Sequence, residues 1–222
     1  MMAISAWLGT PSSVWAQHQG PTLDDYFVQS DNVSITPDTD GFIHRWLLLD
    51  PINKPNRSND VFTDSYIMEN LGKEYYTGQF SKLPKNGQQV KVDNQKLIWH
   101  ALDSKRYNVK LFRFASGRDK QVYGVIFQAV TIIECTEDMP DVRLAVGSNS
   151  ASMWWLNGKQ VLMLSGDRRM VKDDALSSRI SLHRGRNILR GAIINGPGMS
   201  DFCVRLVNEK GLPITNYQIS IK

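Results

Sequence analysis

Residues 142–161 read VRLAVGSNSASMWWLNGKQV, and this stretch gives the clearest indication of the fold. Two apolar runs are separated by small polar residues, and the second run ends at Asn157-Gly158. Both residues of an Asn-Gly pair tolerate positive φ, and the tight turn that they form matches the twist of the strands it joins. The stretch therefore predicts a strand, a turn, a second strand and a hairpin.

A similar pattern follows downstream, where Gly185-Arg186-Asn187 is predicted to turn one alternating strand into the next. Asp93-Asn94-Gln95 predicts a further hairpin. Other strand-like runs cover residues 42–50, 90–92, 96–102, 107–115, 123–135 and 202–207. One short helix is expected within 61–71, because Phe62 and Tyr66 share a helical face and Gly72 ends the pattern.

Short strands separated by Gly, Asn and Pro turns predict an all-β fold. We expect a two-sheet antiparallel β-sandwich with one short helix. A chain of 222 residues suits one such domain, which is predicted to span 41–222. Residues 17–40 are polar and rich in turn residues, and they are interpreted as a linker or an irregular entry to the domain.

The first sixteen residues carry no charged side chain, and Val14-Trp15-Ala16 has the small residues of an export cleavage site. Residues 1–16 are therefore predicted to be a signal peptide, which places the protein outside the cell or in the periplasm. The basic start of such a peptide is missing, so an N-terminal tail is the alternative. No later segment is long and apolar enough to span a membrane.

Basic and acidic residues are interspersed along the chain, 26 against 22, and they form no basic stripe. A nucleic-acid partner is therefore not predicted. The two cysteines, Cys135 and Cys203, both lie in apolar strand-like runs. In an exported protein they could form a disulfide, and two free buried thiols are the alternative.

Residues 142–207 resemble the jelly-roll, galactose-binding-like modules of carbohydrate-active enzymes, so the resemblance implies that the β-sandwich is a jelly roll of the galactose-binding-like kind. The resemblance is carried by Trp155-Leu156-Asn157-Gly158-Lys159 and by the spaced motif from Leu182 to Leu189, with Gly185 and Asn187 inside it. Over 41–207 the chain is also similar to the non-catalytic N-terminal region of secreted bacterial acetylxylan esterases. In those proteins a separate α/β-hydrolase domain carries the chemistry, so the resemblance implies a catalytic esterase domain or a xylan-type glycan as partner.

No catalytic constellation is evident in the sequence. The nucleophile motif Gly-x-Ser-x-Gly is missing, and the stretch from Gly147 to Ala151 has the wrong glycine spacing. The carboxylate pairs Asp24-Asp25 and Asp173-Asp174 are expected to be solvated. The four histidines, His18, His44, His100 and His183, are interpreted as structural or surface residues. Enzymatic activity is left undecided.

Sugar binding is the sharper hypothesis, because an aromatic face can cover the apolar side of a sugar ring while polar groups bind its hydroxyls. Trp154 and Trp155 are neighbours in a strand, so they must point to opposite sides of the sheet. One indole should be in the core, and the other is a candidate platform or a packing surface. Trp46 and Trp99 are expected to be core residues.

The polar loops offer partners for such a platform. Arg168 and Arg169 lie in one loop and Asp201 ends another, and in a jelly roll these loops could gather at one end. An arginine there could bind a uronic acid, since its planar fork suits carboxylates. The alternative is a structural salt bridge to Asp173, Asp174 or Asp201. A structural calcium ion is left open, although no Asp-x-Asp-x-Asp-Gly loop occurs, and no other cofactor is predicted.

These observations predict a non-catalytic carbohydrate-binding or accessory module of a secreted system that degrades plant polysaccharides. The candidate ligand-binding residues are Trp154, Trp155, Arg168, Arg169 and Asp201. One alternative is that the chain is the front part of an acetylxylan-esterase-like enzyme. A second alternative is a purely structural interaction domain without affinity for sugars.

Overall fold

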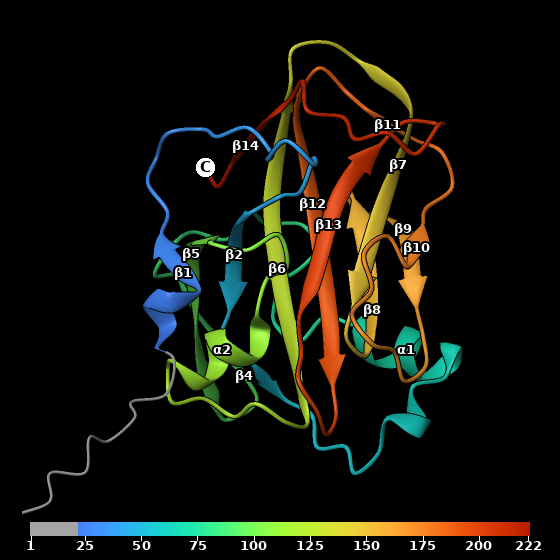
Figure 1. The fold of residues 1–222 in the computed structure, drawn as a ribbon. Helices are drawn as coiled ribbons and strands as arrows, with labels where there is room; N and C mark the ends of the chain where they lie inside the picture. The colour runs from blue at the N-terminus through green and yellow to red at the C-terminus, as the bar shows by residue number, and fades with distance from the viewer. Residues whose placement is uncertain (1–21) are drawn as a thin grey trace, which may run out of the picture.

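The computed structural model describes residues 22–222, and its fold is the predicted all-β sandwich of two antiparallel sheets (Figure 1). The predicted signal peptide, the first part of the predicted linker and His18 lie outside the described residues. Sheet A is large and sheet B is small. The strands of sheet A are β1 (Phe27–Gln29), β2 (Arg45–Leu49), β3 (Ile52–Asn53), β4 (Gln89–Val92), β5 (Gln95–Ser104), β6 (Val125–Cys135), β8 (Ala151–Leu156), β9 (Lys159–Leu164), β12 (Gly185–Asn195) and β14 (Gln218–Ser220).

Sheet B contains β7 (Met139–Ser148), β10 (Ala175–Leu176), β11 (Ile180–Leu182) and β13 (Phe202–Val207). In Figure 1, β13 crosses in front of the long strands β6 and β12 of sheet A. The helical elements are η1 (Leu23–Asp25), η2 (Asn59–Val61), α1 (Asp64–Leu71) and α2 (Leu111–Ser116). The helix predicted within 61–71 is confirmed as α1, which is capped by Thr63 and followed by Gly72.

The stretch at 142–161 folds as its pattern predicts. Asn157 and Gly158 have φ of 51° and 82° and join β8 to β9 as a hairpin. The turn from Ser148 to Ala151 is a crossover, because β7 belongs to sheet B and β8 to sheet A. This crossover therefore connects the small sheet to the large one.

The turn around Gly185 differs from the prediction. It was expected to join two neighbouring strands, but β11 pairs with β7 in sheet B while β12 pairs with β6 and β8 in sheet A. The chain therefore crosses between sheets at His183-Arg184, with Gly185 at φ +88° as the first residue of β12. A local turn pattern does not specify which sheet the next strand joins, and here packing decides.

The strand predicted over 107–115 is wrong, because its second half forms helix α2. The sequence fits two periods at once. Leu111, Phe114 and Ala115 are spaced as one helical face, and all three are buried. The helical arrangement buries these side chains beside sheet A.

The predicted linker at 17–40 is part of the sandwich in its described portion. Strand β1 pairs with the end of β5, and Phe27 is buried. Ile35 forms an isolated bridge with Ile219 near the C-terminal strand. The hairpin predicted at 93–95 is confirmed, with Asp93 at φ 49° between β4 and β5.

Sheet A separates two apolar layers. The inner layer lies between the sheets and contains Trp46, Trp154 and Phe202. The outer layer lies on the other face of sheet A, where α1 and the segment 72–88 cover it. Gly191 permits the inner packing, because a Cβ at this position would lie 2.4 Å from the ring of Trp154.

Both cysteines are buried free thiols, Cys135 on β6 and Cys203 on β13. Burial raises the pKa of both, that of Cys203 to about 11. Among the helices of the described residues, none combines the length and apolarity needed to cross a bilayer.

Candidate functional site

The loops that carry Arg168 and Asp201 do gather at one end of the sandwich. The backbone N–H of Ser150 donates to the carbonyl of Arg168 at 2.9 Å, and that of Asn149 donates to the carbonyl of Asp201 at 2.8 Å. The amide of Asn59 donates to the carboxylate of Asp167 at 2.6 Å. These contacts tie four loops together through main-chain and side-chain hydrogen bonds.

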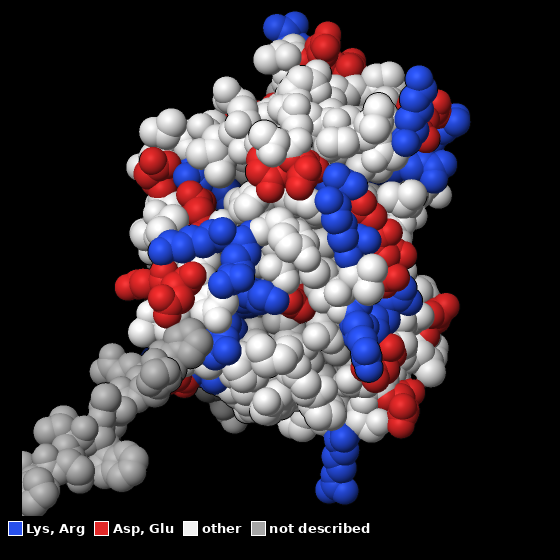
Figure 2. All heavy atoms as spheres, viewed as in Figure 1, with Lys and Arg blue, Asp and Glu red and all other residues white. Residues whose placement is uncertain are grey.

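Two charged side chains of these loops, Arg168 and Asp201, already form ion pairs. Nε of Arg168 donates to Oδ2 of Asp174 at 2.8 Å. Buried Asp201 accepts hydrogen bonds from Asn108 at 2.9 Å and from Lys110 at 2.6 Å. Arg169 is exposed. The salt-bridge alternative is therefore the one observed for Arg168. On the molecular face of Figure 2, Lys and Arg likewise lie beside Asp and Glu.

Trp154 and Trp155 point to opposite faces of sheet A, as the strand period predicts. Trp154 is in the inner layer, where its ring centroid lies 6.1 Å from that of Trp46 and 5.3 Å from that of Phe202. Trp155 is in the outer layer and is only 7% exposed. Of the two alternatives for the second indole, the packing surface is therefore the one observed. Phe80, from the segment 72–88, covers Trp155 with a centroid separation of 5.1 Å.

Two polar side chains interrupt the outer apolar layer beside Trp155. Arg190 is the register partner of Trp155 on β12, and Gln128 lies nearby on β6. The segment 72–88 folds over both. The hydroxyl of Tyr76 donates to Oε1 of Gln128 at 3.2 Å, and Nη2 of Arg190 donates to the carbonyl of Lys82 at 2.8 Å. The cover is thus anchored by hydrogen bonds and by the Phe80 ring.

A pocket of about 350 Å³ opens next to this cover, and we call it the Arg190 pocket. It is lined by Phe80, Ser81, Asn157, Gly158, Ile188 and Arg190. The side chain of Asn157 is fixed in place, because its Nδ2 donates to Oδ1 of Asn187 at 2.9 Å and its Oδ1 accepts from the backbone N–H of Ile188 at 2.8 Å. The hairpin that the sequence predicts so clearly therefore forms one rigid wall of the pocket.

Arg190 gives the pocket its electrostatic character. Its side chain is buried, and it forms no ion pair with any Asp or Glu of residues 22–222. Burial lowers the pKa of Arg190, although not enough to remove its charge at neutral pH. Burial also raises the pKa of the neighbouring Tyr76, so this phenol stays neutral and supplies no counter-charge.

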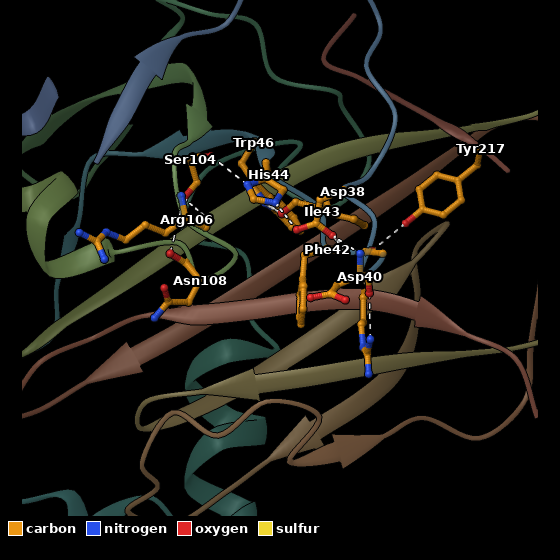
Figure 3. A network of polar contacts seen from close by, with 12 residues as sticks. Asp38, Asp40, Phe42, Ile43, His44, Trp46, Ser104, Arg106, Asn108 and Tyr217 are labelled. Atoms are coloured by element: carbon orange, nitrogen blue, oxygen red, sulfur yellow. Dashed lines mark hydrogen bonds and ion pairs between the residues drawn. The ribbon is translucent and has the colours of Figure 1, made fainter. Parts of the chain in front are cut away.

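Two of the three histidines among the described residues, His44 and His100, have structural surroundings. Figure 3 shows His44 between two acceptors: Nε2 lies 2.8 Å from Oδ2 of Asp38, and Nδ1 lies 2.9 Å from the carbonyl of Ser104. This contact holds the segment before β2 against the end of β5. His100 is buried with Asp50, its Nε2 3.0 Å from the carboxylate. His183 is exposed in the crossover.

Metal-binding side chains do not gather within residues 22–222, where no three His, Cys, Asp or Glu side chains are placed to share an ion.

Sequence reasoning missed both Phe80 and Arg190. A signal existed for Arg190, because it stands alone as a charge within an otherwise apolar run from Ile188 to Ile194. A charge at the centre of such a strand is rarely buried without a partner. Phe80 gave no signal, since the irregular segment 72–88 has no period that would place it over β8.

No protein-family model matches the sequence, and no curated protein matches it significantly. Among solved structures, the fold is similar to the PA14 sugar-binding domain of an RTX adhesin, with a TM-score of 0.46 and 9% identity over 81% of this chain and 100% of that one. It is also similar to the PA14 domain of the antifreeze protein MpAFP, with a TM-score of 0.43 and 10% identity over 87% of this chain and 96% of that one.

A third similarity involves 64% of this chain and 21% of a β-glucosidase from Kluyveromyces marxianus in complex with glucose, with a TM-score of 0.38 and 18% identity.

Proposed function

We propose that this chain is a non-catalytic carbohydrate-binding module and that the Arg190 pocket is its binding site. The observation that carries the proposal is the combination found there: a partly exposed aromatic ring, Phe80, stands beside a buried guanidinium and the polar groups of Ser81 and Asn157. An aromatic face covers the C–H side of a sugar ring, and fixed donors around it bind hydroxyls.

The volume and rigidity of the pocket support the same proposal. About 350 Å³ lies at the lower end of the range for small-ligand sites, which suits one or two sugar units and not a long buried chain. Trp155 would act as a positioning residue, because its indole supports the ring of Phe80 from below. Of the residues predicted from the sequence, the proposed site therefore includes Trp155, in a supporting role. It does not include Arg168, Arg169 or Asp201, and its charged residue is Arg190.

The proposal extends to the biological setting. We place the module in a secreted system that degrades plant polysaccharides, with a xylan-type glycan as ligand or an acetylxylan-esterase-like catalytic domain as covalent neighbour. The resemblance of residues 41–207 to the non-catalytic region of such esterases motivates this setting.

Retention on insoluble xylan, cellulose and pectin tests the proposal, using the chain as it exists and Phe80→Ala. We expect the parent protein to sediment with at least one of these polysaccharides and Phe80→Ala to remain in the supernatant. Phe112→Ala is the matched control, because Phe112 is also partly exposed but lies on α2, outside the Arg190 pocket. This variant should be retained like the parent.

Two results would refute this function. One is that the parent protein is retained by none of the polysaccharides. The other is that Phe80→Ala, shown to be folded by circular dichroism, is retained as well as Phe112→Ala.

A further inference from the structure

We propose that the Arg190 pocket selects acidic glycans, and that the guanidinium of Arg190 is the counter-charge for the carboxylate of a uronic acid. This inference rests on the proposed function, since it assigns the class of sugar that the same pocket would bind.

The argument begins with a comparison of buried arginines. Within residues 22–222, three arginines are buried: Arg45, Arg190 and Arg205. Arg45 donates to Asp103 through Nε and Nη2, each at 2.7 Å, and to Asp31 at 3.0 Å. Arg205 donates to Asp173 through Nε at 2.9 Å. In both cases the hydrogen bonds to the carboxylate raise the pKa of the arginine. Arg190 alone of the three has no carboxylate.

A buried cation without a counter-charge is unfavourable, and proteins ordinarily pair such groups. The pairing here is incomplete in a specific way. A guanidinium has five N–H donors, and one hydrogen bond, to the neutral carbonyl of Lys82, is formed by Arg190. The same side chain lines the open Arg190 pocket. An anionic ligand in this pocket would supply the carboxylate that Arg45 and Arg205 obtain from the fold.

The shape of the donor favours a carboxylate. The planar fork of arginine binds the two oxygens of a carboxylate through parallel hydrogen bonds, which a neutral hydroxyl cannot reproduce. A uronic acid carries this carboxylate on a sugar ring whose C–H face can stack on Phe80. One ligand would then satisfy both the aromatic and the charged wall of the pocket.

The test compares one polymer in two chemical forms. Glucuronic-acid-bearing xylan is used as it is and after reduction of its carboxyl groups to primary alcohols, and binding is measured by affinity electrophoresis. We expect the parent protein to bind the acidic form about tenfold more tightly, the effect of one charge-assisted hydrogen bond. The preference should weaken as salt is added.

Arg190→Gln should bind both forms equally. Arg186→Gln is the matched control, because Arg186 lies on the same strand but is exposed and outside the Arg190 pocket; this variant should keep the preference. Arg190→Lys retains the charge but not the fork, so it should show an intermediate preference.

The outcomes separate the two proposals. Equal binding of both forms by the parent, with Phe80→Ala still abolishing it, overturns the acidic preference and leaves the carbohydrate-binding function intact. A preference that Arg190→Gln and Arg186→Gln reduce to the same extent also overturns it, since that result indicates general surface charge. Because the comparison of the two polymers needs no variant, misfolding of Arg190→Gln would not obscure the result.

Discussion

Two buried charges, Asp50 beside α2 and Arg190 beneath the segment 72–88, differ in the polar partners that the fold gives them. Asp50 is 1% exposed and accepts hydrogen bonds from Nε2 of His100 at 3.0 Å and from the N–H of Ile98 at 3.1 Å. Lys120 and Arg118 lie 3.5 and 3.7 Å from its oxygens. Arg190 is 6% exposed and has one neutral acceptor.

The difference separates a structural charge from a candidate binding charge. Burial opposes the ionisation of Asp50, but the hydrogen bonds from His100 and Ile98, with the charges of His100 and Lys120, lower the pKa of its carboxyl. The fold therefore supplies both the hydrogen bonds and the positive charges that stabilise the Asp50 carboxylate. For Arg190 the fold supplies burial and one neutral acceptor but no carboxylate, and in the proposed function a ligand supplies the counter-charge.

Removing the charge of Asp50, which the fold pairs with other groups, should have the largest effect on stability. Asp50→Asn keeps the size of the side chain but leaves His100, Lys120 and Arg118 without their carboxylate. Breaking a buried ion pair typically costs about 3–5 kcal/mol, and we expect about 3 kcal/mol here because Lys120 and Arg118 are partly exposed. Urea unfolding at neutral pH measures the change.

Glu137→Gln is the control for this substitution, because Glu137 is exposed and should change the free energy of unfolding little. Equal stability of the two variants would mean that Asp50 is not the structural charge that its contacts indicate.

Acidification should remove the same contribution from the parent protein. The pKa of Asp50 in the folded chain lies below its ordinary value of 3.8. Its stabilisation is therefore fully present above that value and is lost as the pH falls through the lower, folded-state pKa. We expect the stability gap between the parent and Asp50→Asn to close over this acid range. Urea midpoints of both proteins, measured from neutral pH down to about pH 2, provide the test; a gap that stays constant contradicts it.

The contrast between Asp50 and Arg190 also shows which features of the fold and the site could be predicted from the sequence. Local patterns predicted the Asn157-Gly158 hairpin, helix α1 and the opposite directions of Trp154 and Trp155, because each depends on residues close together in the chain. Strand period predicts the face on which a side chain lies, but not what covers that face. Burial of Trp155 depends on Phe80, more than seventy residues earlier in the sequence.

The misplaced strand at 107–115 has a related cause. Its apolar residues satisfy both the strand and the helix period, and only the fit beside sheet A selects α2. The same holds for the site: Arg190 was visible as a lone charge in an apolar strand, but its lack of a counter-ion is a property of the whole fold. Asp50 shows that a charge near an apolar strand can equally be fully paired.

Gly191→Ala tests whether the inner face of β12 can be disturbed without affecting the outer face, where the neighbouring Arg190 lies. The new methyl group would lie 2.4 Å from the Trp154 ring in the inner layer, so the ring or the strand must move. Overpacking of this kind costs about 1–3 kcal/mol. We expect lower stability in urea but unchanged glycan retention by the folded protein, because the Arg190 pocket is on the other face.

A second substitution checks the cause. In a Trp154→Leu background the clash is relieved, and Gly191→Ala should then cost less than in the parent. If the cost is the same in both backgrounds, contact with Trp154 is not its origin.

Replacing Arg190, which has no carboxylate partner, should have the smallest effect on stability. Arg190→Met retains the apolar stem of the side chain, loses one hydrogen bond to Lys82 and removes the cost of burying an unpaired cation. These contributions have opposite signs and similar size, so we expect the free energy of unfolding to change by less than about 1 kcal/mol. The same variant should lose retention on acidic glycan. Urea unfolding and sedimentation with the polymer, done on one preparation, test both expectations. A loss as large as that of Asp50→Asn would show that the fold itself depends on Arg190, and would make this arginine a structural residue like Arg45 and Arg205.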